Sequence, residues 1–251
     1  MDAHAYLNRI DYIGGLTPTA ASLRGLQLAH LVSVPFENLS IHAHEPIVLS
    51  EDALFEKIVL RRRGGFCYEL NGLFAALLRQ LGFKVTMLSA GVATSDSGFG
   101  PDFDHMALMV RLADDWLVDV GFGDCFREPL LLHRRDAQPQ GERAYRIADS
   151  SDYLILNETD ASGEWKAHYR FTLQPRQLAD YTEMCHYHQT SPDSHFTQRS
   201  ICSMATPDGR VTLSDMRFIE TTGAARRERV MSDEEEYSAY LKKYFSIEMR
   251  T

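Results

Sequence analysis

The residue best placed for nucleophilic chemistry is Cys67, which follows two glycines in the stretch Arg63-Gly64-Gly65-Phe66-Cys67. Apolar residues recur at helical spacing after it, so Cys67 opens a predicted helix. A thiol at a helix N-terminus lies near unpaired N–H groups and the positive end of the macrodipole, and both favour the thiolate. We therefore expect a lowered pKa for this thiol, with the basic run 61–63 adding positive potential. The alternative is a buried structural cysteine beside a solvated basic run.

A histidine and an aspartate farther along the chain could complete the chemistry of this thiol. His105 begins an apolar strand and is out of phase with the apolar residues at 106, 108, 110 and 112, so it faces the opposite side. Asp119 lies in the apolar stretch 117–123, where an ionised carboxylate is costly unless it is paired. A histidine donor would satisfy it, and the carboxylate would fix the imidazole tautomer. The order Cys67, His105, Asp119 fits a thiol acyl-transfer triad.

The turn between the two strands decides whether His105 and Asp119 can meet. A two-residue turn at 113–114 would set His105 opposite Phe122 and put Asp119 on the other face. A three-residue turn would set His105 opposite Gly121 and put Asp119 on the same face, at a diagonal of roughly 7–8 Å that side chains can bridge. The sequence leaves both registers open.

The elements that must position these residues follow from the hydrophobic periodicity. The first third is helical: Thr17-Pro18-Thr19 starts one helix, Ser50 caps a second, and the third extends to Leu81 with Gly82 as its C′ residue. Strands are predicted over 83–92, 105–112, 115–122, 144–149, 153–156 and 167–173. Such a series favours a closed or partly closed antiparallel barrel.

The C-terminal part combines helices with two short strands. A helix is predicted from Pro175 to about residue 187, and strands over 210–213 and 217–221. The last helix is expected to start at Ser232, with Glu235 three residues on as a capping box. The predicted fold is therefore α+β, with a helical bundle at 1–83, an antiparallel β-barrel at 84–188 and an α/β lid at 189–251.

Composition excludes several classes of function. The 251 residues include 44% hydrophobic and 24% charged residues, as in a globular protein, and carry a formal net charge of −9. A broad nucleic-acid-binding surface is not expected from an acidic chain. No apolar run is long enough for a membrane span, and no secretory signal is recognisable, so the cytoplasm is the expected compartment. The four cysteines are too few and too dispersed for a disulfide framework.

The candidate residues also carry a family resemblance. The sequence resembles the arylamine N-acetyltransferases in five stretches, in order and at similar spacing: YLNRIDY at 6–12, VPFENL at 34–39, RGGFC at 63–67, DVGFG at 119–123 and TPDGR at 206–210. The resemblance spans nearly the whole chain. It implies a helical bundle, a β-barrel and an α/β lid around a cysteine-protease-like Cys-His-Asp core, in the order that periodicity also gives.

The resemblance implies a role for each member of the candidate triad. Cys67 would be the acetylated nucleophile, His105 its base and Asp119 the orienting carboxylate. The implied reaction is ping-pong acetyl transfer from acetyl-CoA, as co-substrate and without a metal, to the nitrogen of an arylamine, arylhydrazine or N-hydroxyarylamine. It implies small-molecule partners and a role in xenobiotic metabolism, with no nucleic acid and no membrane.

Substrate and coenzyme positions are also implied by the resemblance. Phe36 and Phe122 match positions that line the acyl and acceptor pocket, and Gly123 and Tyr187 match positions near coenzyme A. The loop before His105 departs from the animal pattern because it carries acids at 102 and 104, and an aspartate at 193 replaces a hydroxyl residue. Phosphate contacts in those segments therefore cannot be carried over.

Other functions remain open at this point. Within the family, an amide synthase would act on a larger thioester. A cysteine protease or transglutaminase shares the same three residue types, and an inert Cys67 would fit a binding protein. The stretch Cys185-His186-Tyr187-His188, with His195 nearby, could hold a metal, but its spacing is not that of a recognised zinc site.

Arg63, in the basic run before Cys67, is expected to pair with a carboxylate such as Glu37.

Overall fold

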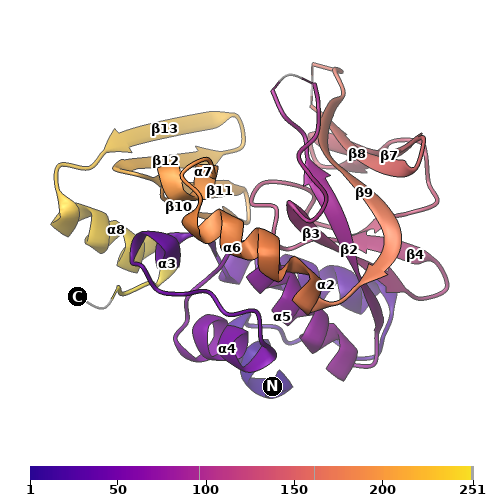
Figure 1. The fold of residues 1–251 in the computed structure, drawn as a ribbon, viewed down its shortest axis with the longest axis horizontal. Helices are drawn as coiled ribbons and strands as arrows, with labels where there is room; N and C mark the ends of the chain where they lie inside the picture. Colours follow the sequence, from indigo (N-terminus) through magenta and orange to yellow (C-terminus); the bar gives the residue numbers. More distant parts are fainter. Residues whose placement is uncertain (96, 161, 250–251) are drawn as a thin grey trace.

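The computed structural model describes residues 1–95, 97–160 and 162–249. Figure 1 shows three groups of elements: helices from the first third of the chain at the bottom, a large sheet at the upper right, and a smaller sheet with helix α8 at the left. Helix α6 lies between the two sheets in this view. Within the described residues, no helix is both long and apolar enough to cross a membrane.

The N-terminal helices begin where the sequence places their caps. Thr19 accepts a hydrogen bond from Ser22 N, Ser50 accepts one from Ala53 N, and Gly82 takes the left-handed conformation (φ 90°) after the third predicted helix. The helices are α1 (Ala3–Arg9), α2 (Ala20–Ser33), α3 (Leu39–His42), α4 (Glu51–Phe55), a π-helical turn at Glu56–Leu60, and α5 (Cys67–Gln80). The three predicted helices are confirmed.

The larger sheet is an eight-stranded antiparallel barrel that is nearly closed. Its strands, in the order β5-β4-β3-β2-β9-β8-β7-β6, are β2 (Lys84–Val92), β3 (His105–Arg111), β4 (Asp115–Val118), β5 (Leu130–Leu131), β6 (Gln138–Gln140), β7 (Arg143–Ser150), β8 (Tyr153–Thr159) and β9 (Lys166–Arg176). The Gln138 side chain, on β6, bridges the gap between the edge strands β5 and β6. Its amide oxygen accepts from Leu131 N at 2.8 Å, and its amide nitrogen donates to Leu131 O at 3.1 Å. All six predicted strands are present, but the one expected over 115–122 ends at Val118.

The C-terminal sheet has five antiparallel strands in the order β1-β10-β11-β12-β13, of which β1 (Phe36–Glu37) comes from the first third of the chain. The other elements are a 3₁₀ turn (Leu178–Tyr181), α6 (Thr182–Thr190), α7 (His195–Gln198), β10 (Ile201–Thr206), β11 (Gly209–Ser214), β12 (Arg217–Thr222), β13 (Ala225–Val230) and α8 (Glu234–Phe245).

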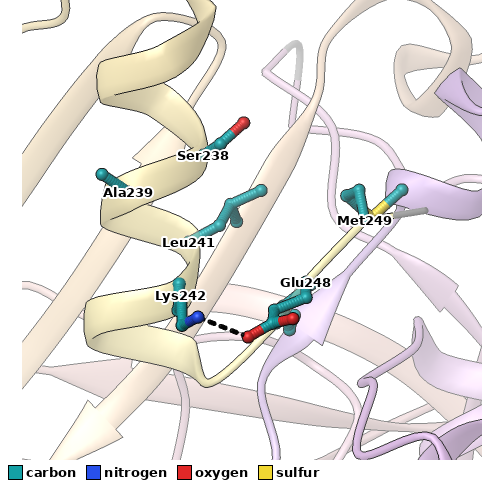
Figure 2. A pocket seen from close by; sticks show the side chains of 7 residues that line it. Ser238, Ala239, Leu241, Lys242, Glu248 and Met249 are labelled. Atoms are coloured by element: carbon teal, nitrogen blue, oxygen red, sulfur yellow. Dashed lines mark ion pairs between the residues drawn. The ribbon is translucent and has the colours of Figure 1, made fainter. Parts of the chain in front are cut away.

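The cap of α8 is one residue later than predicted. Asp233, and not Ser232, is the N-cap, and it accepts a hydrogen bond from Glu236 N at 2.9 Å. Ser232 instead donates its own N–H and hydroxyl to the Glu236 carboxylate. The helix ends at Phe245 with Ser246 as its C-cap, and the chain folds back so that Lys242 pairs with Glu248 at 2.7 Å; Figure 2 shows this pair. The shallow pocket drawn in Figure 2 lies between α8 and the segment 247–249, and none of its lining side chains among the described residues is a predicted site residue.

Strand β3 separates two hydrophobic cores. Its residues Met106, Leu108 and Val110 pack with α5 in the first core, whereas Ala107 and Met109 face the second core inside the barrel. This arrangement confirms that His105 faces away from Met106, Leu108 and Val110. A third core lies between the smaller sheet and α8. The division of the chain after residues 83 and 188 stays a prediction.

Candidate active site

The turn that leads into Cys67 is packed too closely for any side chain at its glycines. A Cβ on Gly64 would lie 1.9 Å from the carbonyl oxygen of Pro35, and one on Gly65 would lie 2.7 Å from the Glu69 side chain. Neither glycine has a positive φ, so backbone conformation does not require them. Both are required because the neighbouring atoms leave no room for a Cβ. The turn is fixed against the segment that contains Pro35, and Cys67 is fixed with it.

Two buried ion pairs lie behind this turn. Arg63 Nε and Nη2 donate to the Glu37 carboxylate at 3.0 and 3.1 Å, which confirms the predicted pairing. Burial raises the pKa of Glu37, but the charges of Lys57 and Arg63 and a backbone hydrogen bond outweigh it and lower that pKa. Lys57 Nζ donates to Glu69 at 2.7 Å, and the other Glu69 oxygen accepts from Phe66 N at 3.1 Å. Glu69 therefore holds the residue directly before Cys67.

Cys67 is the first residue of α5, and its thiol is buried. The residue as a whole is 3% exposed. Burial raises the pKa of the thiol well above its ordinary value, and the charges of Asp104 and Asp119 raise it further. The predicted lowering of this pKa is therefore wrong, because burial and the nearby carboxylates raise the pKa by more than the backbone contribution of Met106 lowers it. The thiol needs a proton acceptor beside it to become a nucleophile.

His105 is bonded to Asp119 by a hydrogen bond between buried side chains. The distance from His105 Nε2 to Asp119 Oδ2 is 2.7 Å, and the two residues are 2% and 3% exposed. Strands β3 and β4 pair with residue 111 opposite residue 115, so the three-residue turn is the one formed. Asp119 approaches more closely than a strand diagonal because β4 has already ended at Val118. Nδ1 is left as the ring nitrogen that can accept a thiol proton.

Asn71 is a residue that the sequence reasoning missed. It lies one helical turn after Cys67, and its Nδ2 donates to Asp119 Oδ1 at 2.9 Å and to the Met106 carbonyl at 2.6 Å. Its Oδ1 accepts from Val120 N at 3.0 Å. One buried amide therefore holds the helix of Cys67 to both the strand of His105 and the Asp119 carboxylate. The available signal was a polar residue among apolar ones, four positions after the cysteine.

Three of the four predicted substrate and coenzyme positions lie around this centre. The Phe122 ring packs edge-on against His105 at 5.1 Å between centroids. Gly123 has a φ of 91°, and its α-carbon faces the Phe36 ring. Tyr187, on α6, is 40% exposed and contacts His188, so it lies farther out than the other three. The predicted residues are thus brought to one region, with Tyr187 at its edge.

His188, near the end of α6, lies between a hydroxyl and a carboxylate. His188 Nδ1 is 3.0 Å from Ser194 Oγ, and its Nε2 is 3.3 Å from Asp104 Oδ1. The Cys185 sulfur accepts a hydrogen bond from Gln189. Among the side chains of the described residues, no three histidine, cysteine or carboxylate groups gather in a way that could hold a metal.

Comparison with known proteins adds a family to this geometry. A sequence model of the family described as N-acetyltransferase matches residues 19–251. The chain is 36% identical over 241 residues to the pineal gland arylamine N-acetyltransferase of Gallus gallus, covering 88% of this chain and 83% of that relative. It is 32% identical over 253 residues to proansamycin X synthase of Amycolatopsis mediterranei, covering 98% and 97%.

Solved structures agree with the sequence comparison. The arylamine N-acetyltransferase of Mycobacterium marinum in complex with CoA superposes with a TM-score of 0.90 at 33% identity, covering 98% of this chain and 93% of the other. At this level of agreement the helical, barrel and lid parts predicted from periodicity and resemblance are confirmed as one α+β fold.

Proposed function

The chain belongs to the arylamine N-acetyltransferase family, and from that premise we propose that it transfers acetyl groups from acetyl-CoA to aromatic nitrogen through an acetyl-Cys67 intermediate. One observation carries the proposal. Cys67 is buried at the start of the helix whose Asn71 side chain bonds both the Met106 carbonyl, directly after His105, and the Asp119 carboxylate, and His105 is itself bonded to Asp119 at 2.7 Å. A buried thiol with a raised pKa has little reactivity alone, and this arrangement supplies the base that it needs.

In the proposed first half-reaction, Cys67 Sγ attacks the thioester carbonyl carbon of acetyl-CoA while its proton passes to His105 Nδ1. The buried Asp119 carboxylate stabilises the imidazolium that forms. The tetrahedral intermediate collapses as the carbon–sulfur bond to coenzyme A breaks. The departing thiolate takes the proton from His105, so that free coenzyme A and acetyl-Cys67 remain.

In the second half-reaction the acceptor nitrogen attacks the acetyl carbon of acetyl-Cys67. His105 takes a proton from the attacking nitrogen and returns it to the departing Cys67 sulfur, which restores the resting thiol. The oxyanion of each tetrahedral intermediate would be stabilised by N–H groups in the first turn of α5, which have no acceptor within the helix. A donor of this kind contributes about 3–4 kcal/mol in acyl transfer.

The surroundings of the thiol support an aromatic acceptor and a water-poor site. Phe122 packs against both His105 and Tyr169, and the Phe36 ring on β1 lies against Gly123, the next residue after Phe122. We assign Phe36 and Phe122 to the acceptor pocket, because aromatic rings bind a flat apolar amine and protect a thioester from water. Gly123 and Tyr187 stay the proposed coenzyme contacts. The proposed setting is acetylation of foreign aromatic amines in the cytoplasm.

An isotope-exchange experiment tests the ping-pong order. Labelled coenzyme A, mixed with the protein and unlabelled acetyl-CoA in the absence of any amine, should become labelled acetyl-CoA, because the first half-reaction is reversible. Adding an aniline or an arylhydrazine should then release the acetylated nitrogen product. A protein that acetylates the amine but never exchanges label without it would use direct transfer, and the acetyl-cysteine intermediate would be wrong.

A second candidate function has one specific observation in its favour. The chain resembles proansamycin X synthase over 97% of that relative's length, about as fully as it resembles the acetyltransferases. The same thiol chemistry on a larger thioester would form an amide of a longer acyl chain. Acylation rates measured with acetyl-, hexanoyl- and benzoyl-CoA separate the two functions: acetyl transfer predicts the fastest rate with acetyl-CoA, and the synthase predicts the reverse order.

A further inference from the structure

Three aromatic rings contact the side chain of Phe122, which we assign to the acceptor pocket. The ring centroids of His105 and His168 each lie 5.1 Å from that of Phe122, and both imidazoles are nearly perpendicular to its ring. The Tyr169 centroid lies 5.2 Å away. His105 is held by Asp119, and Tyr169 is fully buried. His168, whose side chain is 21% exposed, is therefore the contact whose position needs a separate explanation.

A β-bulge brings His168 to the same side of strand β9 as its neighbour Tyr169. Successive side chains of a regular strand point to opposite faces, so in a regular strand only one of these two rings would face Phe122. The pairing with β8 shifts at this point: the consecutive β8 residues 156–157 lie opposite β9 residues 169 and 167, which leaves His168 as one extra residue. An extra residue of this kind re-aims a side chain. The bulge therefore explains how both rings contact Phe122.

The re-aimed imidazole is anchored by a carboxylate on the neighbouring strand. His168 Nε2 lies 2.8 Å from Glu158 Oε2 on β8, and the Glu158 side chain is 17% exposed. An ionised carboxylate only accepts hydrogen bonds, so Nε2 carries the proton and donates it to this bond. The bond fixes both the tautomer and the orientation of the ring. His168 therefore meets Phe122 in a single orientation.

The anchor is itself connected to the loop that carries Phe122. Arg143 Nη1, on β7, lies 3.5 Å from Glu158 Oε1, and the two terminal nitrogens of Arg143 donate to the Asp124 carboxylate at 3.1 and 3.2 Å. Asp124 lies two residues after Phe122. The side chains of Arg143 and Asp124 are 40% and 50% exposed, so this outer pair orients Glu158 more than it adds stability. The contacts run from Phe122 through β9, β8 and β7 and return to its own loop.

Phe122 lies in a loop, so its ring depends on contacts of this kind. Strand β4 ends at Val118 and β5 begins at Leu130, and Phe122 lies between them. The next residue, Gly123, has a left-handed backbone (φ 91°). In a loop, packed side chains rather than ladder hydrogen bonds decide where a ring lies. Removal of the His168 ring would leave a space into which the Phe122 ring can turn.

We propose that His168 is a positioning residue for the acceptor pocket: the bulge in β9 aims its ring at Phe122, Glu158 anchors the ring, and the anchored ring fixes Phe122 as the wall that limits the size of the acceptor. The proposal rests on the proposed function, because it takes Phe122 as part of that pocket. It assigns His168 no contact with the reacting atoms.

The first experiment compares a large and a small acceptor by kcat/KM, which for the amine reports only the second half-reaction of a ping-pong enzyme. In His168→Ala the Phe122 ring should turn into the vacated space, so kcat/KM for 4-aminobiphenyl relative to that for aniline should rise roughly tenfold. Single-turnover acetylation of Cys67 should stay within about twofold, because His105 keeps its bond to Asp119. Equal losses in both half-reactions with an unchanged acceptor ratio would show a role in folding alone and overturn the proposal.

Two variants of Glu158 test the anchor and leave the His168 ring in place. Glu158→Gln retains an oxygen that accepts from His168 Nε2, so it should keep the parent acceptor ratio. Glu158→Ala removes that oxygen, and its ratio should move in the same direction as in His168→Ala. The matched control is His133→Ala, whose exposed ring lies 3.8 Å from the Asp114 carboxylate, and it should leave the ratio in place. A Glu158→Ala protein with the parent ratio would overturn the proposal.

The second experiment needs neither acetyl-CoA nor an amine. Cys67 is alkylated with iodoacetamide or with N-phenylmaleimide, and the modified cysteine is identified by peptide mass. The rate with N-phenylmaleimide relative to that with iodoacetamide should rise about fivefold in His168→Ala and Glu158→Ala, and it should not rise in Glu158→Gln. Parent-like reagent ratios in both alanine variants overturn the proposal. Shifted reagent ratios in a protein that does not exchange label with coenzyme A would contradict the proposed function and uphold the positioning of Phe122 by His168.

Discussion

The Asp119→Asn variant is expected to fold like the parent protein and to acetylate Cys67 roughly 10³–10⁴-fold more slowly, as in other triads that lose this carboxylate. Asp119 Oδ1 accepts hydrogen bonds from Asn71 Nδ2 and Gly121 N, and an asparagine oxygen can accept both. Its NH₂ group must then face His105 Nε2, which becomes an acceptor. The ring proton moves to Nδ1, and the nitrogen that should take the thiol proton is already occupied.

Asp115→Asn is the matched control for this experiment. Asp115 begins strand β4, which ends one residue before Asp119, but it pairs with the exposed Arg111, so its loss should leave the acetylation rate within about twofold. Single-turnover acetylation and urea unfolding, measured on both variants, separate rate from stability. An Asp119→Asn protein that folds and acetylates Cys67 at the parent rate would remove Asp119 from the mechanism. Asp104 and Asp102 would then be the next carboxylates to test.

The Gly64→Ala variant should lose about 3 kcal/mol of unfolding free energy, at the upper end of overpacking effects, and should acetylate poorly when it folds. The added methyl group would lie 1.9 Å from the Pro35 carbonyl oxygen and 2.9 Å from the Glu37 side chain. Backbone cannot move aside as a side-chain end can, so the turn itself must shift. The shift would displace Cys67 and disturb the buried Arg63–Glu37 pair behind it.

Gly15→Ala provides the comparison. A Cβ at Gly15 meets no atom within 4 Å, and its φ is not positive, so its unfolding free energy should stay within about 0.5 kcal/mol of the parent. Urea unfolding monitored by fluorescence and by circular dichroism measures both. Equal stability of the two variants would mean that the turn before Cys67 tolerates a side chain and does not depend on the close approach of Pro35.

The elements that could be predicted from sequence are those with a strong period or a strong terminal signal. Helix α5 has both, since its leucine and phenylalanine residues are fully buried and Gly82 closes it. Strand β13 (Ala225–Val230) could not be found in this way, because every residue of this edge strand is exposed and no apolar alternation remains. Strands β5 and β6 are only two and three residues long, and the side chain of Gln138 replaces the missing backbone pairing.

The same distinction applies to the site. The thiol, the imidazole and the carboxylate stood out because their residue types and surroundings are unusual in sequence, and the structure brings them together. Asn71 was not predicted, because its role depends on contacts between segments distant in sequence. The direction of the Cys67 pKa shift was predicted wrongly for a related reason. The helix terminus is legible in sequence, whereas the depth of burial and the nearby carboxylates are not.

The most direct test of the central claim is the intact mass of the protein after mixing with acetyl-CoA alone. The account predicts the addition of one acetyl group, located on Cys67 by peptide mass, absent from Cys67→Ala and removed when an arylamine is added. Cys125, Cys185 and Cys202 serve as internal controls, since all are free thiols in the same molecule. An acetyl group on one of those three cysteines, or acetylation that persists in Cys67→Ala, would contradict the assignment of Cys67 as the nucleophile.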